Sequence, residues 1–351
     1  MRTNLLPFLV APGLLLAQLP RVGLVEIYGL HKVSAKSVQA ALGVQPGDPL
    51  PASKAPIEDR LSKLPGVARA SLEAFCCDGD KAVLYVGIEA REAHHFETRP
   101  VPTQEIALSP YIANAYHQFL DAGADTARTE DRLRELATTE FADLKNALHN
   151  AVDPAERATA TAVIRYAPDQ RVAIAELQFA MQDSDEVVRA NAMRGLDAFI
   201  ASSAASSSRG RKGVDAGPPL AGANGAQSAG VTVQPTWFIE MLNSIVWSER
   251  THAANTLLEL TAKRDPATLD QIRQRGVESL AEMANWHIAA HAKPAFVLLG
   301  RIAGLRDDEI ERQWASGERK KTIERALKVK RVAGAPETIS VPYWKTPEMR
   351  P

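Results

Sequence analysis

The chain has 351 residues, 45% of them hydrophobic, and its formal net charge at pH 7 is −1. This length allows two or three domains, and the hydrophobic content is sufficient for ordinary packed cores. The near-neutral charge argues against a surface built throughout for nucleic acid, because such binding depends on many cations that neutralise phosphates. Cys76 and Cys77 are adjacent, so we interpret them as small strand residues, with a redox or intermolecular role as the alternative.

Residues 1–20 have the pattern of a secretory signal peptide. Arg2 precedes an apolar run at residues 5–16, and the small residue Ala17 follows. The run is short for a membrane span, and no second apolar segment follows it. We therefore expect a signal peptide and a mature chain that is periplasmic or secreted. An uncleaved membrane anchor is the alternative.

Residues 21–91 have the pattern of a small α+β domain. An apolar run at residues 22–27 predicts a strand that stops at Gly29. Ser34 and Gly43 are typical of the start and the end of a helix, which predicts a helix between them.

A second helix and two strands are expected next in the same domain. Apolar residues at helical spacing, from Ile57 to Leu64, predict the helix. The runs at 68–75 and 81–90 predict strands, and the Asp-Gly-Asp sequence at 78–80 is typical of a hairpin turn. The expected order is strand, helix, helix, strand, strand.

These segments resemble the POTRA domain, the polypeptide-transport-associated module of outer-membrane assembly and secretion proteins. The resemblance lies in VEIYGLHKVSAKSVQAAL, GDPL, IEDRLSKLPGVARASLE and AVLYVGIEAR. It implies an extracytoplasmic location and binding through an exposed strand edge, whose unpaired N–H and C=O groups accept another strand. The candidate partner-binding residues here are Leu72, Ala74 and Phe75. A cystatin-like or ferredoxin-like half-sheet that only spaces the chain is the alternative.

The next segment is expected to connect this domain to helices. Residues 92–110 contain His94, His95 and several prolines, and we predict a linker with solvated histidines. Apolar residues at helical spacing then predict a helical region over residues 111–201.

Short helix pairs recur along the chain. The spacing Arg-x-x-Ala-x-x-x-(Leu or Ile) occurs three times, each time on the second helix of a predicted pair and after a turn with acidic or serine residues. Asp185 and its neighbours stand where a helix begins, so their oxygens can accept free backbone N–H groups. The residues of this repeat signature are Asp153, Arg157, Ala160, Asp183, Asp185, Arg189, Ala192, Leu196, Arg250, Ala253 and Leu257.

These repeats resemble the HEAT family, and in particular its short subgroup first named from phycobilisome lyases. The D-x-D-x-x-V-R-x-x-A run at residues 183–192 carries the resemblance most closely. It implies that the arginine braces the turn between the two helices and that the alanine allows close helix packing. The resemblance covers about residues 140–262, and a fourth pair at 266–305 is expected to cap the array.

The C-terminal part is expected to contain a loop, further helices and a tail. The Ser/Gly/Ala-rich residues 202–234 predict a flexible loop that projects from the solenoid. HEAT-like helices and a basic terminal helix are expected at 235–331, and an extended tail at 332–351. The basic helix offers Lys320, Lys321, Arg325 and Lys328 to an anionic membrane surface or an acidic partner, or is simply a solvated cap.

The fold class predicted from the sequence is therefore an α+β POTRA-like domain followed by an all-α HEAT-like solenoid. His287 and His291 have the spacing of a metal-binding pair, but Ile288 stands where a metalloprotease needs glutamate, and we expect no metal or cofactor. We expect a non-enzymatic scaffold whose partners are other proteins, of the cell envelope, and not nucleic acid. The alternatives are an assembly factor at the envelope or membrane surface and a hydrolase or metal enzyme.

Overall fold

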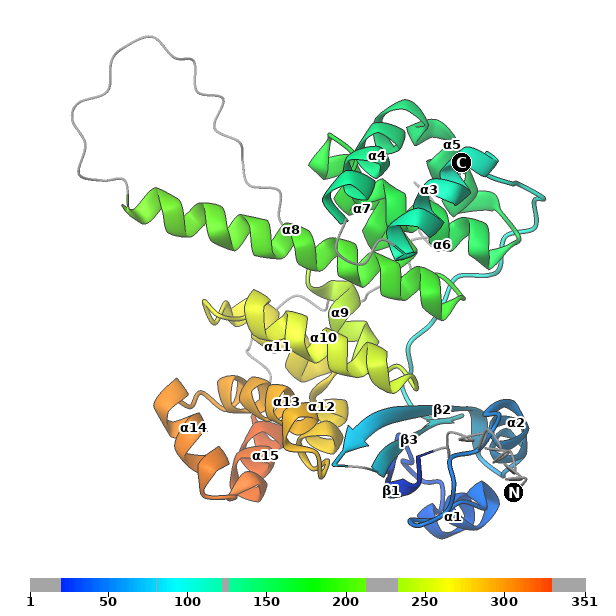
Figure 1. Cartoon of the computed structure of the whole chain (residues 1–351). Helices are drawn as coiled ribbons and strands as arrows, with labels where there is room; N and C mark the ends of the chain where they lie inside the picture. Colours follow the sequence, from blue (N-terminus) through cyan, green and yellow to red (C-terminus); the bar gives the residue numbers. More distant parts are fainter. Residues whose placement is uncertain (1–19, 80, 122–125, 213–232, 330–351) are drawn as a thin grey trace, which may run out of the picture.

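The computed structural model describes residues 20–79, 81–121, 126–212 and 233–329. A small mixed sheet with two helices forms the N-terminal part, and a mostly helical region follows it (Figure 1). The predicted signal peptide, apart from Pro20, and the predicted tail at 332–351 lie outside the described residues. In the part of the chain that the structure describes, no helix is long and apolar enough to cross a membrane.

The N-terminal domain has the predicted order of elements. It consists of β1 (Val22–Tyr28), α1 (Ala35–Leu42), α2 (Ala55–Ser62), β2 (Val67–Asp78) and β3 (Lys81–Ala90). The sheet order is β1-β3-β2, with β1 parallel and β2 antiparallel to the central strand β3. The prediction of an α+β domain with the order strand, helix, helix, strand, strand is confirmed.

Local signals explain where the first helix begins and ends. The Ser34 side chain accepts a hydrogen bond from the Ser37 N–H at 3.3 Å, and Gly43 ends the helix in the left-handed conformation with φ 65°. Both helices cover one face of the sheet, and this first core contains Val22, Val38, Leu42, Ile57, Leu61, Val67, Leu72, Leu84, Val86 and Ile88.

The helical region is built from consecutive helix pairs. Its elements are α3 (Pro110–Asp121), α4 (Thr126–Thr139), α5 (Phe141–Asn150), α6 (Pro154–Ile164), α7 (Gln170–Ala180), α8 (Glu186–Lys212), α9 (Thr236–Met241), α10 (Trp247–Leu260), α11 (Pro266–Arg275), α12 (Val277–Ala284), α13 (Ala289–Ile302), α14 (Asp307–Ala315) and α15 (Arg319–Lys328). The second helices of successive pairs stack in the order α6, α8, α10, α13, α15. This arrangement confirms the prediction of a helical region after the sheet.

One boundary differs from the prediction. The helix α8 continues to Lys212, so residues 202–212 are helical rather than part of the predicted loop at 202–234. The physical reason is that alanine is the best helix former and serine is tolerated, and no proline interrupts this part of the tract. Residues 213–232 of the predicted loop lie outside the described residues.

The second face of the sheet packs against the helical region, so the two parts share one core. The Tyr28 hydroxyl donates a hydrogen bond of 2.6 Å to the carbonyl of Ile245, which lies in the turn between α9 and α10. At Gly87, in the middle of β3, an added Cβ would lie 1.9 Å from the same carbonyl oxygen. Only glycine permits this close approach of the sheet to the helices.

Candidate functional site

An aromatic cluster joins the sheet to the helices. The rings of Tyr85 and Trp247 stack with centroids 4.6 Å apart, and the Phe75 and His291 rings meet edge to face at 4.6 Å. The Tyr85 hydroxyl lies 2.6 Å from Nδ1 of His291. Burial raises the pKa of Tyr85 and lowers that of His291, so we describe this bond as donated by a neutral tyrosine to a neutral imidazole.

This packing changes the role of two predicted partner-binding residues. Leu72 is only 2% exposed because it lies in the core between the sheet and the helices α1 and α2. Phe75 faces the other way and packs on Trp247 and His291. Leu72 is therefore inaccessible to a partner, and Phe75 is partly buried against the helical region. Ala74 is exposed, as a partner-binding residue must be.

The free edge of β2 remains as a candidate binding surface. The Leu72 N–H does not bond to β3 but donates to Oε1 of Glu58, on α2, at 2.8 Å. Because alternate residues of an antiparallel strand turn their backbone groups to the same side, Ala70 and Ala74 also face outward.

The outer edge of β1 is occupied at its start. The Val22 N–H donates to the Asp48 carbonyl at 2.8 Å, and the Gly47 N–H donates to the Val22 carbonyl at 2.7 Å. Just beyond the end of β1, the Gly29 N–H donates to the Glu282 carboxylate of α12. These contacts leave β2 as the better candidate for strand addition.

A groove runs beside β2, between the sheet and α8. It consists of two hollows of about 360 and 320 Å³, both of which are lined by Glu186 and Val246. The first also contacts Arg69 and Ser71 on β2, and the second reaches Met193 on α8. Val187, on the α8 wall of the second hollow, is 49% exposed, which gives the groove an apolar surface open to solvent.

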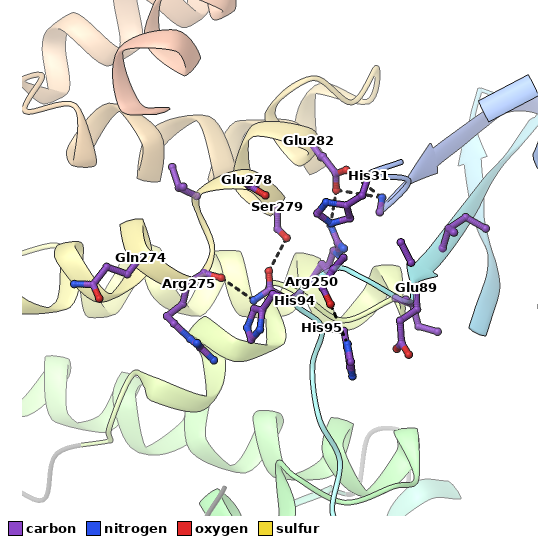
Figure 2. A pocket seen from close by; sticks show the side chains of 17 residues that line it. His31, Glu89, His94, His95, Arg250, Gln274, Arg275, Glu278, Ser279 and Glu282 are labelled. Atoms are coloured by element: carbon purple, nitrogen blue, oxygen red, sulfur yellow. Dashed lines mark hydrogen bonds and ion pairs between the residues drawn. The ribbon is translucent and has the colours of Figure 1, made fainter. Parts of the chain in front are cut away.

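A third hollow, of about 450 Å³, lies between the sheet and helices α9 to α12 (Figure 2). On its wall, Arg275 binds the Glu240 carboxylate with two hydrogen bonds of 2.8 and 2.9 Å, and His94 lies 3.1 Å from the same carboxylate. Burial alone raises the pKa of Glu240, but the hydrogen bonds from His94 and Arg275 outweigh it and lower the pKa. These contacts hold α9, α11 and the segment that follows β3 together, and we assign this hollow no ligand.

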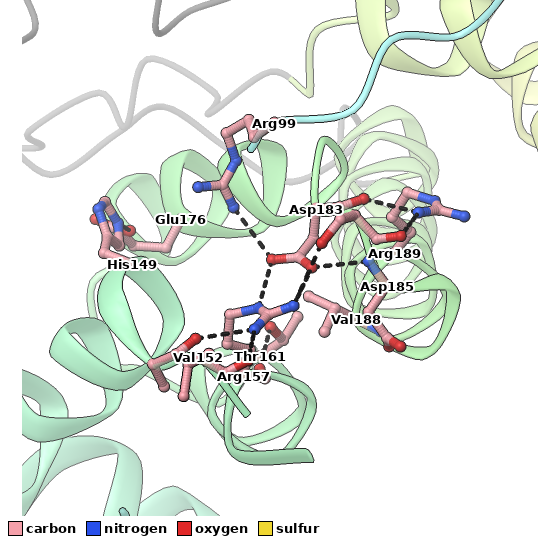
Figure 3. A network of polar contacts seen from close by, with 12 residues as sticks. Arg99, His149, Val152, Arg157, Thr161, Glu176, Asp183, Asp185, Val188 and Arg189 are labelled. Carbon is pink, nitrogen blue, oxygen red and sulfur yellow. Dashed lines mark hydrogen bonds and ion pairs between the residues drawn. The ribbon is translucent and has the colours of Figure 1, made fainter. Parts of the chain in front are cut away.

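The arginines of the predicted repeat signature form a buried polar network along the turns within the helix pairs, and Figure 3 shows its part around Arg157 and Arg189. Arg157 is 1% exposed, and its Nε and Nη2 each lie 2.9 Å from the Asp183 carboxylate. Its Nη1 donates to the carbonyls of Ala151 and Val152, in the turn before α6. Arg157 therefore links its own turn to the turn of the next pair.

Arg189 and Arg250 make equivalent contacts. Arg189 donates to the carbonyls of Asp183 and Ser184 and pairs with Glu249 at 2.6 Å. Arg250 donates to the Ser244 carbonyl and pairs with Glu282 at 3.1 Å. Each arginine thus braces the turn that precedes its helix and bonds to an acid of the following pair.

The other signature residues act as caps or lie in the helix interfaces. Asp153 accepts from the Ala155 N–H at 2.8 Å, and Asp185 accepts from the Val187 and Val188 N–H groups at 2.9 and 3.1 Å. The apolar members are fully buried, namely Ala160, Ala192, Leu196, Ala253 and Leu257.

Residues 92–109, which we call the strap, cross the same turns instead of spanning open solvent as a linker. Phe96 is buried with its ring 5.8 Å from the Arg189 guanidinium. The Arg99 guanidinium lies 3.4 Å above the Phe179 ring and 3.4 Å from Asp183, and burial lowers the pKa of Arg99 to about 10. Gln104 forms a parallel bridge to Ala151. The strap therefore covers the arginine network from the α9–α10 pair to the α5–α6 pair.

The basic residues predicted on the terminal helix lie on the surface. Ile323 and Ala326 of α15 are buried against the preceding helices, whereas Leu327 is 48% exposed. The exposed basic side chains are Lys320, Lys321, Arg325 and Lys328.

The histidine pair and the cysteines complete the predicted positions. His287 contacts Glu26 at 2.8 Å, whereas His291 contacts Tyr85, so the two rings have different partners. Among the described residues, no group of three or more histidine, cysteine or acidic side chains has a metal-binding arrangement. Cys76 takes part in a disulfide bond, which differs from our reading of it as a chemically inert strand residue, and the side chain of Cys77 lies outside the described part.

Comparison with known proteins adds no assignment: no protein-family model matches the chain, and no curated protein matches it. The sequence did not point to Lys54, Glu58, Glu186 or Val246, which line the groove, because these residues come from separate elements and share no local pattern.

Proposed function

We propose that this protein is an extracytoplasmic protein–protein interaction scaffold that binds an extended segment of a partner along the free edge of β2. The observation that carries the proposal is the groove beside this edge, with outward backbone groups on one wall and the exposed Val187 on the other. Main-chain hydrogen bonds to an edge strand supply affinity, and adjacent hollows supply selectivity for side chains. The proposal assigns no catalysis to the chain.

The helical region serves as the rigid support in this proposal. The buried arginine network ties each helix pair to the next, as expected for a HEAT-like array, and supports that assignment. The order of the sheet and its helices supports the POTRA-like assignment. Because the sheet is docked on the array, the edge of β2 and the start of α8 are held at a fixed separation.

Site-specific photo-crosslinking tests this function. A benzoylphenylalanine placed at Ala74, on the free edge of β2, or at Val187, on the α8 wall of the groove, is expected to capture the same partner protein in intact cells of the source organism. Tyr111 is the matched control, because it is 55% exposed and lies on α3, away from the groove (Figure 1). Capture with equal yield from Tyr111, or of unrelated proteins from the two groove positions, would overturn the proposal. Fractionation of the same cells tests the extracytoplasmic location.

A second candidate function is an assembly factor at an anionic membrane surface. The outward face of α15, with its four exposed basic residues and Leu327, favours it. Co-sedimentation with vesicles of neutral lipid, with and without anionic lipid, tests this function. A membrane function predicts that the protein pellets only with anionic vesicles at low salt. Reversal of the charges on Lys320 and Lys321 should abolish this pelleting. Failure to pellet at low salt would exclude it.

A further inference from the structure

We infer that Glu58 and Lys54 occupy, within the free protein, the places that a partner's backbone carbonyl and a partner's basic side chain take when the groove is filled. This inference rests on the proposed function of the groove. It adds the chemistry of the partner, an extended segment that carries lysine or arginine, and an internal latch that the partner displaces.

The first half of the latch is the bond between Glu58 and the edge of β2. A carboxylate oxygen lies 2.8 Å from the Leu72 nitrogen, on the side of β2 that faces away from β3. The carbonyl oxygen of an added strand would accept this N–H from the same side. A side chain that fills this position also protects the edge from pairing with another copy of the chain.

The second half of the latch is Lys54, at the start of α2. Its ammonium lies 3.9 Å from Glu58 and 3.7 Å from Glu186, the first residue of α8. Lys54 therefore bridges the groove from the sheet domain to the helical array. The Lys54 and Glu186 side chains are 49% and 51% exposed, and ion pairs of such exposure are weak, so a competing cation can replace Lys54.

The adjoining hollow is lined by three carboxylates, Glu73, Glu186 and Glu249, and by two basic side chains, Arg194 and His252. His252 is already bonded to Asp197 and Glu249 to Arg189, so Glu73 and Glu186 are the carboxylates that a further basic side chain would meet. Glu73 faces the hollow and accepts hydrogen bonds from the N–H and hydroxyl of Ser248, at 2.8 and 2.7 Å, rather than from a cationic side chain. Val187, Met193 and Val246 supply an apolar surface beside this carboxylate. A lysine or arginine can lay its aliphatic stem along these side chains and place its charged end near Glu73 and Glu186.

Hydrogen exchange tests the first half of the latch, the bond between Glu58 and the Leu72 N–H, without a partner. In Glu58→Ala the Leu72 amide should exchange at least about tenfold faster, because a bond to a charged acceptor is lost. The amide of Glu73, which faces β3, should keep its rate and serves as the internal control. An unchanged Leu72 rate would overturn the latch.

Peptide binding tests the second half of the latch, the ion pairs of Lys54. The probes are a short, labelled, end-blocked peptide of alternating valine and threonine with one central lysine, and the same peptide with norleucine in place of lysine. Lys54→Ala should raise the affinity for the lysine peptide about two- to fivefold and leave that for the norleucine peptide unchanged. Glu186→Gln should lower the affinity for the lysine peptide. Lys63→Ala is the matched control, because Lys63 forms an exposed pair with Asp59 on the same helix, 2.6 Å apart.

Equal gains for both peptides, or no binding to any variant, would overturn the inference about the partner's chemistry. Neither result would affect the crosslinking test, so failure of this inference and failure of the proposed function are distinguishable.

Discussion

Replacement of Arg157 by methionine should destabilise the protein more than any surface change of the same type. Methionine preserves much of the volume but removes the partner of the buried Asp183 carboxylate. That carboxylate would keep only the Asp185 N–H at 2.9 Å and the Arg99 guanidinium at 3.4 Å. The carbonyls of Ala151 and Val152 would also lose their donor.

The size of the effect follows from burial. Removal of one partner of a buried ion pair costs about 3–5 kcal/mol, because the other charge stays buried and loses its closest partner. An unfolding entropy of about 2.1 cal/mol/K per residue gives about 0.7 kcal/mol/K for this chain. The expected decrease in melting temperature is therefore about 4–7 °C.

Calorimetry of four variants, namely Arg157→Met, Arg134→Met, Asp183→Asn and the double variant of Arg157 and Asp183, checks this expectation. Arg134→Met is the control, because Arg134 also contacts two acids, Glu130 and Asp131, but is half exposed, and it should cost no more than about 1 kcal/mol. In the Arg157→Met background, Asp183→Asn should lower the melting temperature less than it does in the parent, since the carboxylate has already lost Arg157 there. Equal melting temperatures for Arg157→Met and Arg134→Met would refute the bracing role.

Three further predictions concern the contact between the sheet and the helices, and the strap. Gly87→Val forces a clash with the Ile245 carbonyl and should separate the sheet from the helices near Trp247. Tryptophan fluorescence should then shift to the red, while the far-ultraviolet circular dichroism is retained. An unchanged emission would contradict the close approach. Burial depresses the pKa of His291 in the folded state, so the unfolded state binds the proton first. Stability should therefore fall as the pH drops below about 6.5, and His291→Gln should reduce this fall, as measured by urea titration at several pH values. Phe96→Ala should cost about 3–5 kcal/mol and speed hydrogen exchange in the strap, and protection equal to the parent would argue against its packing there.

Local signals were sufficient to predict the elements of the N-terminal domain. Ser34, Gly43 and the Asp-Gly turn at 78–79 each act within a few residues, and the structure places β1, α1, α2, β2 and β3 accordingly. The recurring arginine spacing likewise indicates helix pairs, because each arginine bonds to the turn that directly precedes its own helix. Such features are predictable because the interaction that produces them is encoded within one short stretch.

The docking of the sheet on the helices was not predictable in the same way. Tyr85, Trp247 and His291 lie far apart in the sequence, and each is an ordinary apolar or aromatic residue in its own segment. The strap has no periodicity, so only its contacts with the turns reveal that it is ordered. Leu72 and Phe75 were assigned to a free edge because a single strand does not show which of its faces are covered.

The proposed function requires that a partner adds to the edge of β2 within the groove. Ala74→Pro tests it most directly, because it removes an outward N–H that β3 does not use, and proline is tolerated on an edge strand. With the photo-crosslinker at Val187, on the α8 wall of the groove, Ala74→Pro is expected to abolish capture of the partner while the fold is retained. Capture from Val187 at the parent's yield, in a folded Ala74→Pro variant, would contradict it.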